Sequence, residues 1–473
     1  MIKTSMMRIK LLKRIDSFGQ LELLVSIVAG LILGYSLVSS RHLLFIALVC
    51  LIFFVAVFLS HHTGVVFLFV SVFFLPWFSE YLKIVPREST LFIELMIGIL
   101  FCKVLFLKLS GKQWKRTPID KLVVLVVFFS LLSALINFES PVVVMLGFRK
   151  FFKYILLFYI LINLDLEEKF YRKMLKMLMI IAIIQIPVAI IEWLIVGVGD
   201  NVVGTLGANA TGLMGIFMAF IACLFLGFYL HEGKVFNIVF IVSLFVPVVL
   251  GSGRFGFIAI PSAVLFSLLT IKQWDVRKFI RIVCATVIVV VAIWGAIDSH
   301  DRVSERGQIL GHFTSLEDMF DYTTGYAKGG ILNRTEAVIF ANGLISQNPS
   351  SFILGFGPGS ASPSFIGFAG DLEKKYSDLR IWGVQLSWTL LEYGFLGLIL
   401  FIGLFIVLFR FNSKFYLRID DNFWKAIAFG YNGLVFVMII SISYMTCWVS
   451  DVLAFTFWFL SAAIVSVSRE SRL

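Results

Sequence analysis

The sequence predicts an all-α polytopic integral membrane protein with about fourteen transmembrane helices and one large extracytoplasmic (periplasmic) loop. Of the 473 residues, 60% are hydrophobic and only 15% are charged, whereas a soluble domain is usually about half apolar and a quarter charged. Apolar runs of roughly 17–25 residues recur along the chain, and each is long enough to cross a bilayer core of about 30 Å. Between residues 298 and 384 these runs give way to one long polar segment.

The apolar runs divide the chain into three parts. Residues 1–298 are expected to form a transmembrane bundle of about eleven helices, residues 299–384 the large loop with an amphipathic helix, and residues 385–473 about three further spans. The expected spans are roughly 21–39, 43–60, 63–80, 90–108, 121–137, 142–163, 176–198, 210–230, 235–250, 254–271, 281–298, 385–409, 425–446 and 451–468.

The distribution of Lys and Arg predicts the orientation. If the N-terminus is cytoplasmic, every second loop is basic, as is typical of the cytoplasmic side of a membrane protein. The basic loops contain Lys112, Lys115 and Arg116, then Lys169, Arg172 and Lys173, then Lys272, Arg277 and Lys278, and then Arg410, Lys414 and Arg418. We therefore expect both termini in the cytoplasm and the large loop outside it. The net charge of +11 then reflects topology, and nucleic acid is not an expected partner.

Several ionisable residues lie in or beside apolar runs, where insertion costs at least roughly 2.5 kcal/mol each. Arg149, Lys150 and Lys153 lie near the expected outer start of one span, and Arg254 stands in a glycine-flanked turn where two spans meet. One alternative is that these basic residues snorkel to the lipid head groups. Glu392, an acidic residue in the apolar run 385–409, could alternatively pair with an arginine. Arg can bind phosphate through two parallel hydrogen bonds. The gathering of these Arg and Lys residues on the outer side therefore favours a lipid pyrophosphate site.

The large loop contains a predicted amphipathic helix. Asn333 is suited to cap its N-terminus, and Glu336 follows three residues later, as in a capping box. Apolar residues then recur at helical spacing through Ile345. Arg334 would project from the first turn, toward or just above the membrane surface.

Other residues of the loop give weaker signals. Gly355, Gly357 and Gly359 permit a sharp turn or the close approach of a ligand, although such clusters are common in ordinary loops. His312 could act as a general base, with a solvent-facing surface histidine as the alternative. The acidic residues of the loop and the five cysteines show no metal-ligand spacing. Neither a metal site nor a cofactor is expected.

The order of these features resembles the O-antigen polymerase/ligase family of bacterial envelope polysaccharide enzymes. The resemblance covers roughly residues 145–400, and its specificity lies in the order and spacing of short motifs. The matching segments are Arg149-Lys150, Gly204-Thr205-Leu206-Gly207-Ala208-Asn209, Ser252-Gly253-Arg254-Phe255-Gly256, the run from Arg334 to Gly359, and Glu392-Tyr393-Gly394-Phe395-Leu396-Gly397.

The resemblance implies a GT-C-like, metal-independent glycosyltransferase of the bacterial inner membrane. Its donor and acceptor would be undecaprenyl-pyrophosphate-linked glycans, with membrane lipid around it and a chain-length regulator protein as a further candidate partner. Arg254 and Arg334 would hold pyrophosphate or glycan, supported by Arg149 and Lys150. Ligases of the family carry a His shortly before the Glu-Gly motif, and residues 382–387 here contain none, which favours a polymerase.

Three functions remain open at this point. The leading one is a polymerase of lipid-linked repeat units, and the alternatives are a ligase that transfers glycan to lipid A-core or protein, and a flippase. A flippase would need charges along a central cavity, whereas here they concentrate on the outer side. The candidate general bases are Glu336, Glu392 and His312, in falling order. The candidate substrate-binding residues are Arg149, Lys150, Lys153, Asn209, Gly355 and Gly357.

Overall fold

The computed structural model describes residues 60–197, 201–208, 210–251, 253–270, 331–363 and 367–470, together with Val55, Val57, Phe58 and Ile280. Within these ranges every regular element is a helix and no strand is present. The side chains of Arg87 and Arg254 also lie outside what the structure describes. The expected spans 21–39 and 281–298 fall outside these residues, as does most of 43–60.

Twelve apolar helices, counted within the described ranges, make up the bundle. They are α3 (His61–Pro76), α4 (Leu91–Leu109), α5 (Asp120–Ile136), α6 (Pro141–Asn163), α7 (Glu168–Val196), α8 (Thr211–Glu232), α9 (Phe236–Ser243), α10 (Phe245–Leu250), α11 (Arg254–Leu269), α17 (Gln385–Arg418), α18 (Asn422–Ile440) and α19 (Asp451–Glu470). The shorter elements are η1 (Trp77–Tyr81), η2 (Arg87–Thr90), α14 (Arg334–Ile345), α15 (Pro349–Leu354), α16 (Asp371–Tyr376), η4 (Ser377–Leu379) and η5 (Ser441–Ser443).

Most described helices overlap the expected spans. Helix α7 begins at Glu168 and α17 continues to Arg418, however, so the basic residues that the sequence placed in loops at 169–173 and 410–418 lie in the ends of these helices. Seven of the described helices are long and apolar enough to cross a membrane. These are His61–Tyr81, Glu88–Leu109, Glu168–Val196, Thr211–Glu232, Gln385–Arg418, Asn422–Ser443 and Asp451–Glu470. Helix α5 matches a further expected span with 17 residues, and α6 matches another while carrying Arg149, Lys150 and Lys153.

One expected span is interrupted. The apolar run 235–250 forms two short helices, α9 and α10, which are separated at Leu244. Pro247 has no backbone N–H to donate to the carbonyl of Ser243, which is the last residue of α9. The break therefore falls where proline removes the next helical hydrogen bond.

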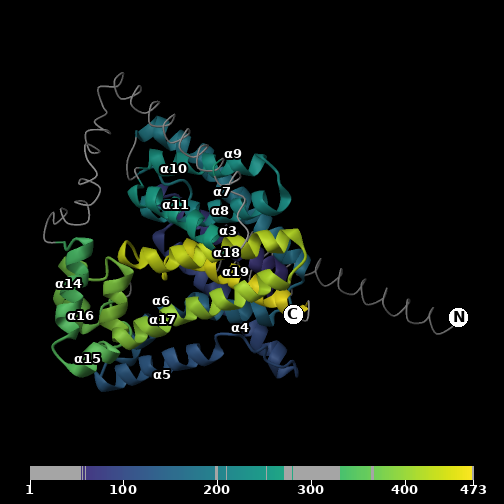
Figure 1. Ribbon diagram of the computed structural model, residues 1–473. Helices are drawn as coiled ribbons and strands as arrows, with labels where there is room; N and C mark the ends of the chain where they lie inside the picture. The colour runs from purple at the N-terminus through teal and green to yellow at the C-terminus, as the bar shows by residue number, and fades with distance from the viewer. Residues whose placement is uncertain are drawn as a thin grey trace, which may run out of the picture.

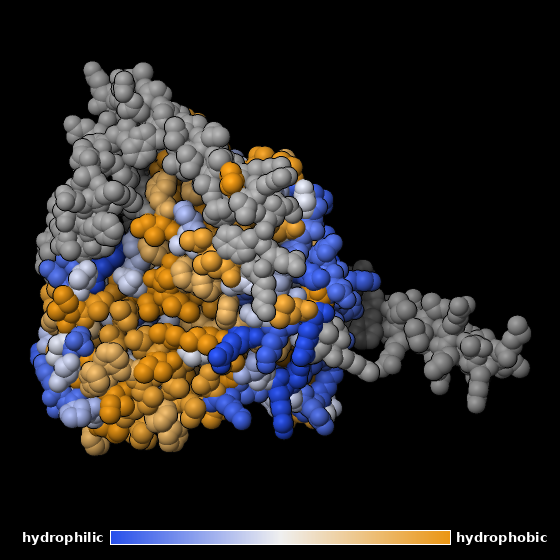
Figure 2. Space-filling view, in the orientation of Figure 1, coloured by the Kyte–Doolittle hydropathy of each residue, from blue (hydrophilic) through white to orange (hydrophobic). Residues whose placement is uncertain are grey.

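Apolar side chains cover much of the outer surface of the bundle. Phe128 on α5 is 57% exposed, Leu135 on the same helix 72%, and Leu194 on α7 67%. Figure 2 shows hydrophobic residues over the broad middle of one face, with hydrophilic residues at its left edge and on its right. Soluble monomers rarely expose continuous apolar surface of this kind. Together with the long apolar helices, it indicates a helical membrane protein.

Helices α8 and α19 lie at the centre, and their segments Leu213–Tyr229 and Val452–Ser468 are buried throughout. Glycines let their neighbours approach closely: a Cβ on Gly227 of α8 would lie 2.1 Å from the carbonyl oxygen of Ala426 on α18. Likewise, a Cβ on Gly215 of α8 would lie 3.0 Å from the Cα of Gly256 on α11. Small residues at helix contacts are typical of membrane bundles, where close backbone packing replaces the hydrophobic driving force.

The described part of the 299–384 loop folds against one end of the bundle. In Figure 1, α14, α15 and α16 gather at the end where α17 begins, and α15 contacts both α5 and α17. The predicted capping box is confirmed, because Asn333 Oδ1 accepts from the Glu336 N–H at 2.8 Å and the Glu336 carboxylate accepts from the Asn333 N–H at 3.3 Å. Helix α14 ends at Ile345, as the apolar spacing predicts.

Candidate functional site

The basic residues of α6 face a cavity inside the bundle. Its volume is about 510 Å³, and Arg149, Lys150 and Lys153 line it together with Trp382 and Trp388. Arg149 follows the start of α6 by eight residues, which is roughly 12 Å along the helix axis at 1.5 Å per residue. The three cations therefore lie two turns or more into α6, in a cavity that also reaches the first residues of α4 and α19.

Carboxylates from other helices neutralise two of these cations. Arg149 Nε lies 2.7 Å from Glu94 Oε2 on α4, and Lys153 Nζ lies 2.6 Å from Asp451 Oδ1 at the start of α19. Lys153 Nζ is also 3.8 Å from Glu94 Oε1. The Lys153 side chain is only 12% exposed. It therefore faces other helices and does not extend to the lipid head groups. Paired charges of this kind are the ones that persist in low-dielectric surroundings.

Lys150 is held differently. Its ammonium group donates to the backbone carbonyl of Pro363, and it lies 5.3 Å from the centroid of the Trp388 ring. A carbonyl and an aromatic face both attract a cation without carrying a full negative charge. Among the three basic residues of the cavity, Lys150 is thus held by neutral groups instead of a carboxylate within salt-bridge distance.

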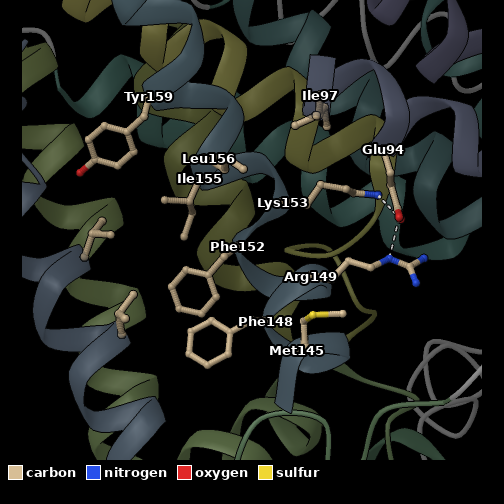
Figure 3. Close-up of a pocket in the computed structure, with 13 residues that line it drawn as sticks. Glu94, Ile97, Met145, Phe148, Arg149, Phe152, Lys153, Ile155, Leu156 and Tyr159 are labelled. Atoms are coloured by element: carbon tan, nitrogen blue, oxygen red, sulfur yellow. Dashed lines mark ion pairs between the residues drawn. The ribbon is translucent and has the colours of Figure 1, made fainter. Parts of the chain in front are cut away.

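A second hollow adjoins the cavity. This apolar groove, of about 540 Å³, lies between α4, α5 and α6. Glu94, Arg149 and Lys153 line both the groove and the cavity. Figure 3 shows these three residues at one side of the groove, with Phe148 and Phe152 in its middle and Tyr159 farthest from Glu94. The groove therefore ends in charged groups on one side and is otherwise apolar.

The groove is accessible from the lipid-facing side of the bundle. Met145, which lines it, is 67% exposed, and Leu156 is 37% exposed. The rings of Phe148 and Phe152 stack with centroids 4.8 Å apart along its wall. At its far side, the Tyr159 hydroxyl donates to Asp120 Oδ1 at 2.9 Å. A hydrocarbon chain could enter this groove directly from the membrane.

Arg334 lies at a second cationic position, which we call the arginine pole (Arg334, Tyr444 and the start of α11). Arg334 Nε donates to the backbone carbonyl of Tyr444 at 2.8 Å, and its guanidinium carbon lies 4.1 Å from the centroid of the Tyr444 ring. Phe255 also contacts Tyr444. Their rings stack with centroids 4.3 Å apart and an angle of 15° between the ring planes. Arg254 directly precedes Phe255, so both predicted arginines lie in segments that contact Tyr444.

Three helices begin near the arginine pole. Helix α14 begins at Arg334, α11 at Arg254 and α8 at Thr211. Gly212 packs against Tyr444, since a Cβ on it would lie 2.9 Å from the ring. The N-terminus of a helix carries a partial positive charge, which favours an anion, although at α14 the capping box already uses the N–H groups of Asn333 and Glu336. The pole therefore combines a guanidinium with several helix N-termini.

The pole and the cavity are neighbours. Tyr444 belongs to the pole, and Thr446, two residues later, lines the cavity. Two residues span at most about 7 Å of extended chain. The connection then ends at Asp451, the first residue of α19 and the partner of Lys153. One short segment thus joins both groups of cations.

The glycine cluster is placed against a break in α17. Gly394 has φ +63° and ψ −169° inside this helix, so the helical hydrogen bonds there are interrupted. The Phe356 N–H donates to the carbonyl of Leu391 at 2.7 Å, and the Gly357 N–H donates to the carbonyl of Glu392 at 3.1 Å. The turn of the loop therefore supplies donors that the broken helix lacks.

The glycines are required by backbone contacts. Gly355, Gly357 and Gly359 have φ values of +73°, +101° and +88°. A Cβ on Gly359 would lie 2.1 Å from the Val143 carbonyl oxygen, and a Cβ on Gly355 would lie 2.6 Å from the backbone of Glu392. Both alternatives at this cluster, a sharp turn and the approach of a ligand, were open from the sequence. The structure shows a sharp turn packed on α5, α6 and α17.

Glu392 stabilises this turn from inside the protein. It is completely buried, and its Oε1 accepts hydrogen bonds from Ser362 Oγ at 2.7 Å and from Trp388 Nε1 at 2.8 Å. Within the described ranges these partners are a hydroxyl and an indole, not the arginine that the sequence offered as an alternative. By fixing Trp388, Glu392 also orients the ring on which Lys150 rests.

Of the remaining candidate residues, some make structural contacts and others lie outside the described residues. The carboxylate of Glu336 is used in the capping box of α14, which gives it a structural role. Glu192 accepts from the N–H groups of Val203 and Gly204 at 2.9 and 2.8 Å and so fixes the segment before Asn209. Asn209 itself and His312 lie outside the described residues.

Two functional candidates were not found from the sequence. Glu94 lies within one apolar run and Asp451 begins another, so a carboxylate in or beside an expected span was the available signal. Their partners on α6 are distant in sequence, which is why the pairing could not be predicted. Outside the spans, burial together with the nearby carboxylates of Asp371 and Glu392 raises the pKa of Glu139 to about 7. Burial also raises the pKa of Glu373, against the opposing effect of Lys150.

Comparison with known proteins adds no assignment. No family model matches the chain, and no curated protein matches it. Over the described ranges, no three His, Cys, Asp or Glu side chains come together as metal ligands. The functional argument therefore rests on the cavity, the groove and the arginine pole.

Proposed function

We propose that this protein is a metal-independent membrane glycosyltransferase of the O-antigen polymerase/ligase family, with a GT-C-like arrangement of about fourteen spans. It would polymerise undecaprenyl-pyrophosphate-linked repeat units on the outer side of the bacterial inner membrane, into O-antigen or a related surface polysaccharide. Both termini would lie in the cytoplasm. The observation that supports this best is the junction of an apolar groove with a charged cavity at Arg149 and Lys153.

A ligand that fills both hollows needs a hydrocarbon part and an anionic part. The groove excludes a free sugar nucleotide, because its walls are built from residues such as Phe148, Phe152 and Ile155. A polyprenyl chain fits these walls, and its pyrophosphate would reach the cations of α6. Lateral entry from the membrane is possible through the exposed side of the groove at Met145.

The reaction would be an in-line displacement at an anomeric carbon. The acceptor hydroxyl oxygen forms the new bond to that carbon, the bond from the carbon to the pyrophosphate oxygen breaks, and the lipid pyrophosphate leaves with the electron pair. The acceptor proton passes to a general base. Arg334, Arg254 and the adjoining α6 cations would stabilise the charge on the leaving group, because pre-placed donors act most strongly where charge develops.

The presence of two adjoining groups of cations favours a polymerase. In polymerisation both donor and acceptor carry a lipid pyrophosphate, so two anionic head groups must lie close together. The cavity around Lys153 and the pole around Arg334 are joined by the segment from Tyr444 to Asp451. Each could receive one head group.

Deletion of the gene tests the proposal and separates it from the alternatives. A polymerase-deficient strain should carry single capped repeat units on a surface-glycan gel, and a plasmid copy should restore the ladder. Complete loss of transferred glycan would indicate a ligase. Lipid-linked units trapped on the cytoplasmic face would indicate a flippase. Purified protein given lipid-linked units extracted from the deletion strain should produce the ladder in the presence of a chelator.

A further inference from the structure

The groove meets the cavity at Glu94, Arg149 and Lys153, and we call this charged end the mouth of the groove. It already contains an anion of the protein itself, the Glu94 carboxylate. Glu94 lies 2.7 Å from Arg149 and 3.8 Å from Lys153, at the boundary shared by groove and cavity (Figure 3). Arg149 and Lys153 are therefore already within reach of a carboxylate when a lipid phosphate arrives from the groove.

We propose that this mouth is an anion-exchange site, in which Glu94 is the resident anion that a lipid phosphate displaces from Arg149. The carboxylate would return to Arg149 when the spent lipid leaves. The ligand is a phosphate or pyrophosphate monoester of a long-chain isoprenoid, with its chain in the groove. This inference rests on the proposed function for the identity of the lipid.

The geometry allows this exchange at Arg149 more easily than at Lys153. The Arg149 and Glu94 side chains are 28% and 24% exposed, so both can move toward the hollows beside them. Lys153 keeps its closer carboxylate, Asp451 at 2.6 Å, when Glu94 withdraws. One ion pair is therefore exchangeable, and the adjacent one holds α6 against α19.

The released carboxylate has a favourable place to remain. Glu94 lies near the N-terminal end of α4, which continues directly from η2, and the partial positive charge of a helix N-terminus favours a negative charge. The exchange therefore replaces one partner of Arg149 with another without leaving Glu94 in purely apolar surroundings. A resident anion weakens lipid binding, which helps a product with the same head group to dissociate.

Two roles for Glu94 predict opposite results. If Glu94 competes with the lipid, Glu94→Gln leaves Arg149 unpaired in the empty protein and makes lipid binding tighter. If Glu94 only positions Arg149, the same substitution makes binding weaker. The tests use full-length protein in phosphatidylcholine nanodiscs, with undecaprenyl phosphate as the probe and native mass spectrometry to measure occupancy.

We expect Glu94→Gln to bind undecaprenyl phosphate about tenfold more tightly than the parent. Its unfolding midpoint should be lower than that of the parent without lipid and should recover when undecaprenyl phosphate is added. Glu232→Gln is the matched control, since Glu232 also forms an ion pair, with Lys234 at 2.8 Å, and lines neither hollow; it should leave the affinity unchanged. Inorganic phosphate and phosphatidylglycerol should bind more weakly than the probe to every variant.

Equal or weaker binding by Glu94→Gln overturns the exchange site, as does an equal gain in Glu232→Gln, which would indicate a general charge effect. Inorganic phosphate as effective as the probe would remove the role of the groove. If Glu94→Gln does not fold, Glu94→Asp replaces it, with a smaller gain expected and no gain overturning the inference. Failure of the lipid to bind, with polymerisation intact in cells, overturns this site and leaves the proposed function standing.

Discussion

Arg334 is the residue at which sequence motif and geometry meet most closely. Its planar guanidinium lies over the Tyr444 ring and donates to the Tyr444 carbonyl at the same time. Lysine carries the same charge but lacks the planar group that stacks and forms several directed hydrogen bonds. The position is therefore suited to a test that separates charge from shape.

Arg334→Lys should lose most polymerisation while its level in the membrane stays near normal. Loss of one well-placed donor to a developing anion typically lowers the rate by about 10²–10³. A glycan ladder from the complemented deletion strain measures the effect, with a membrane immunoblot for protein level. Arg380→Lys, at an exposed position of the same loop, is the control and should polymerise normally. A normal ladder from Arg334→Lys would reduce Arg334 to a structural contact of Tyr444.

At the scale of elements, the break in α17 and the glycine turn depend on each other. Gly394 occupies a backbone region that is essentially restricted to glycine, at φ +63° and ψ −169°. A Cβ there would also lie 2.4 Å from the Ile353 carbonyl oxygen of α15. The break thus allows α15 and the turn at residues 355–357 to reach the helix.

Gly394→Ala should destabilise the protein by at least about 1–3 kcal/mol, from backbone strain with the clash added. The expected result is a lower unfolding midpoint and a weak or absent ladder. Gly343→Ala is the matched control, because Gly343 lies in α14 and a Cβ added to it would meet nothing within 4 Å. This control should be neutral or slightly stabilising, since alanine is favoured over glycine in a helix. An unchanged midpoint for Gly394→Ala would contradict the dependence on the break.

The connection between α5 and α6 should respond to pH. Burial, with Asp371 and Glu392 nearby, raises the pKa of Glu139 to about 7 from an ordinary value of 4.5. Between these two values the folded protein binds more protons at Glu139 than the unfolded chain does. The contribution of this group to stability is therefore largest below pH 4.5 and falls as the pH rises toward 7.

Glu139→Gln should remove this part of the pH dependence. At pH 8 the variant should unfold at a higher temperature than the parent, and near pH 4.5 the two should be similar. Thermal unfolding in nanodiscs at several pH values measures the difference, which partial exposure of Glu139 keeps small. Asp378→Asn, an exposed carboxylate of the same loop, should leave the pH profile unchanged. A parent and variant that differ equally at both pH values would contradict the assignment.

For the whole molecule, the decisive prediction is orientation. Reporter fusions near Gly325 should report the outer side, and fusions near Lys115 and Lys414 should report the cytoplasm, because the basic loops alternate along the chain. A cytoplasmic signal at Gly325 would place the loop, the cavity and the arginine pole on the wrong side for a lipid-linked donor. It would overturn the mechanism together with the topology.

The sequence alone determined the class of the protein and the approximate position of most apolar helices within the described ranges. Apolar runs fix the spans because each must fill the bilayer core by itself, which is a local property of the chain. The capping box at Asn333 and Glu336 was predictable for the same reason, since its partners are three residues apart. The importance of Arg149, Lys150 and Lys153 was also visible, because a charge inside a span is costly wherever it points.

Only the tertiary structure decided what these residues contact. Glu94, Asp451 and the Pro363 carbonyl reach the α6 cations from other parts of the chain, and no local pattern specifies such pairings. The glycine cluster predicted a turn, but its packing on the break at Gly394 depended on how α15 lies against α17. Likewise, Arg334 and Phe255 both contact the Tyr444 ring, because α8, α11 and α14 begin near one another. Spacing along a chain determines each helix, whereas distances between helices depend on the packing of all of them together.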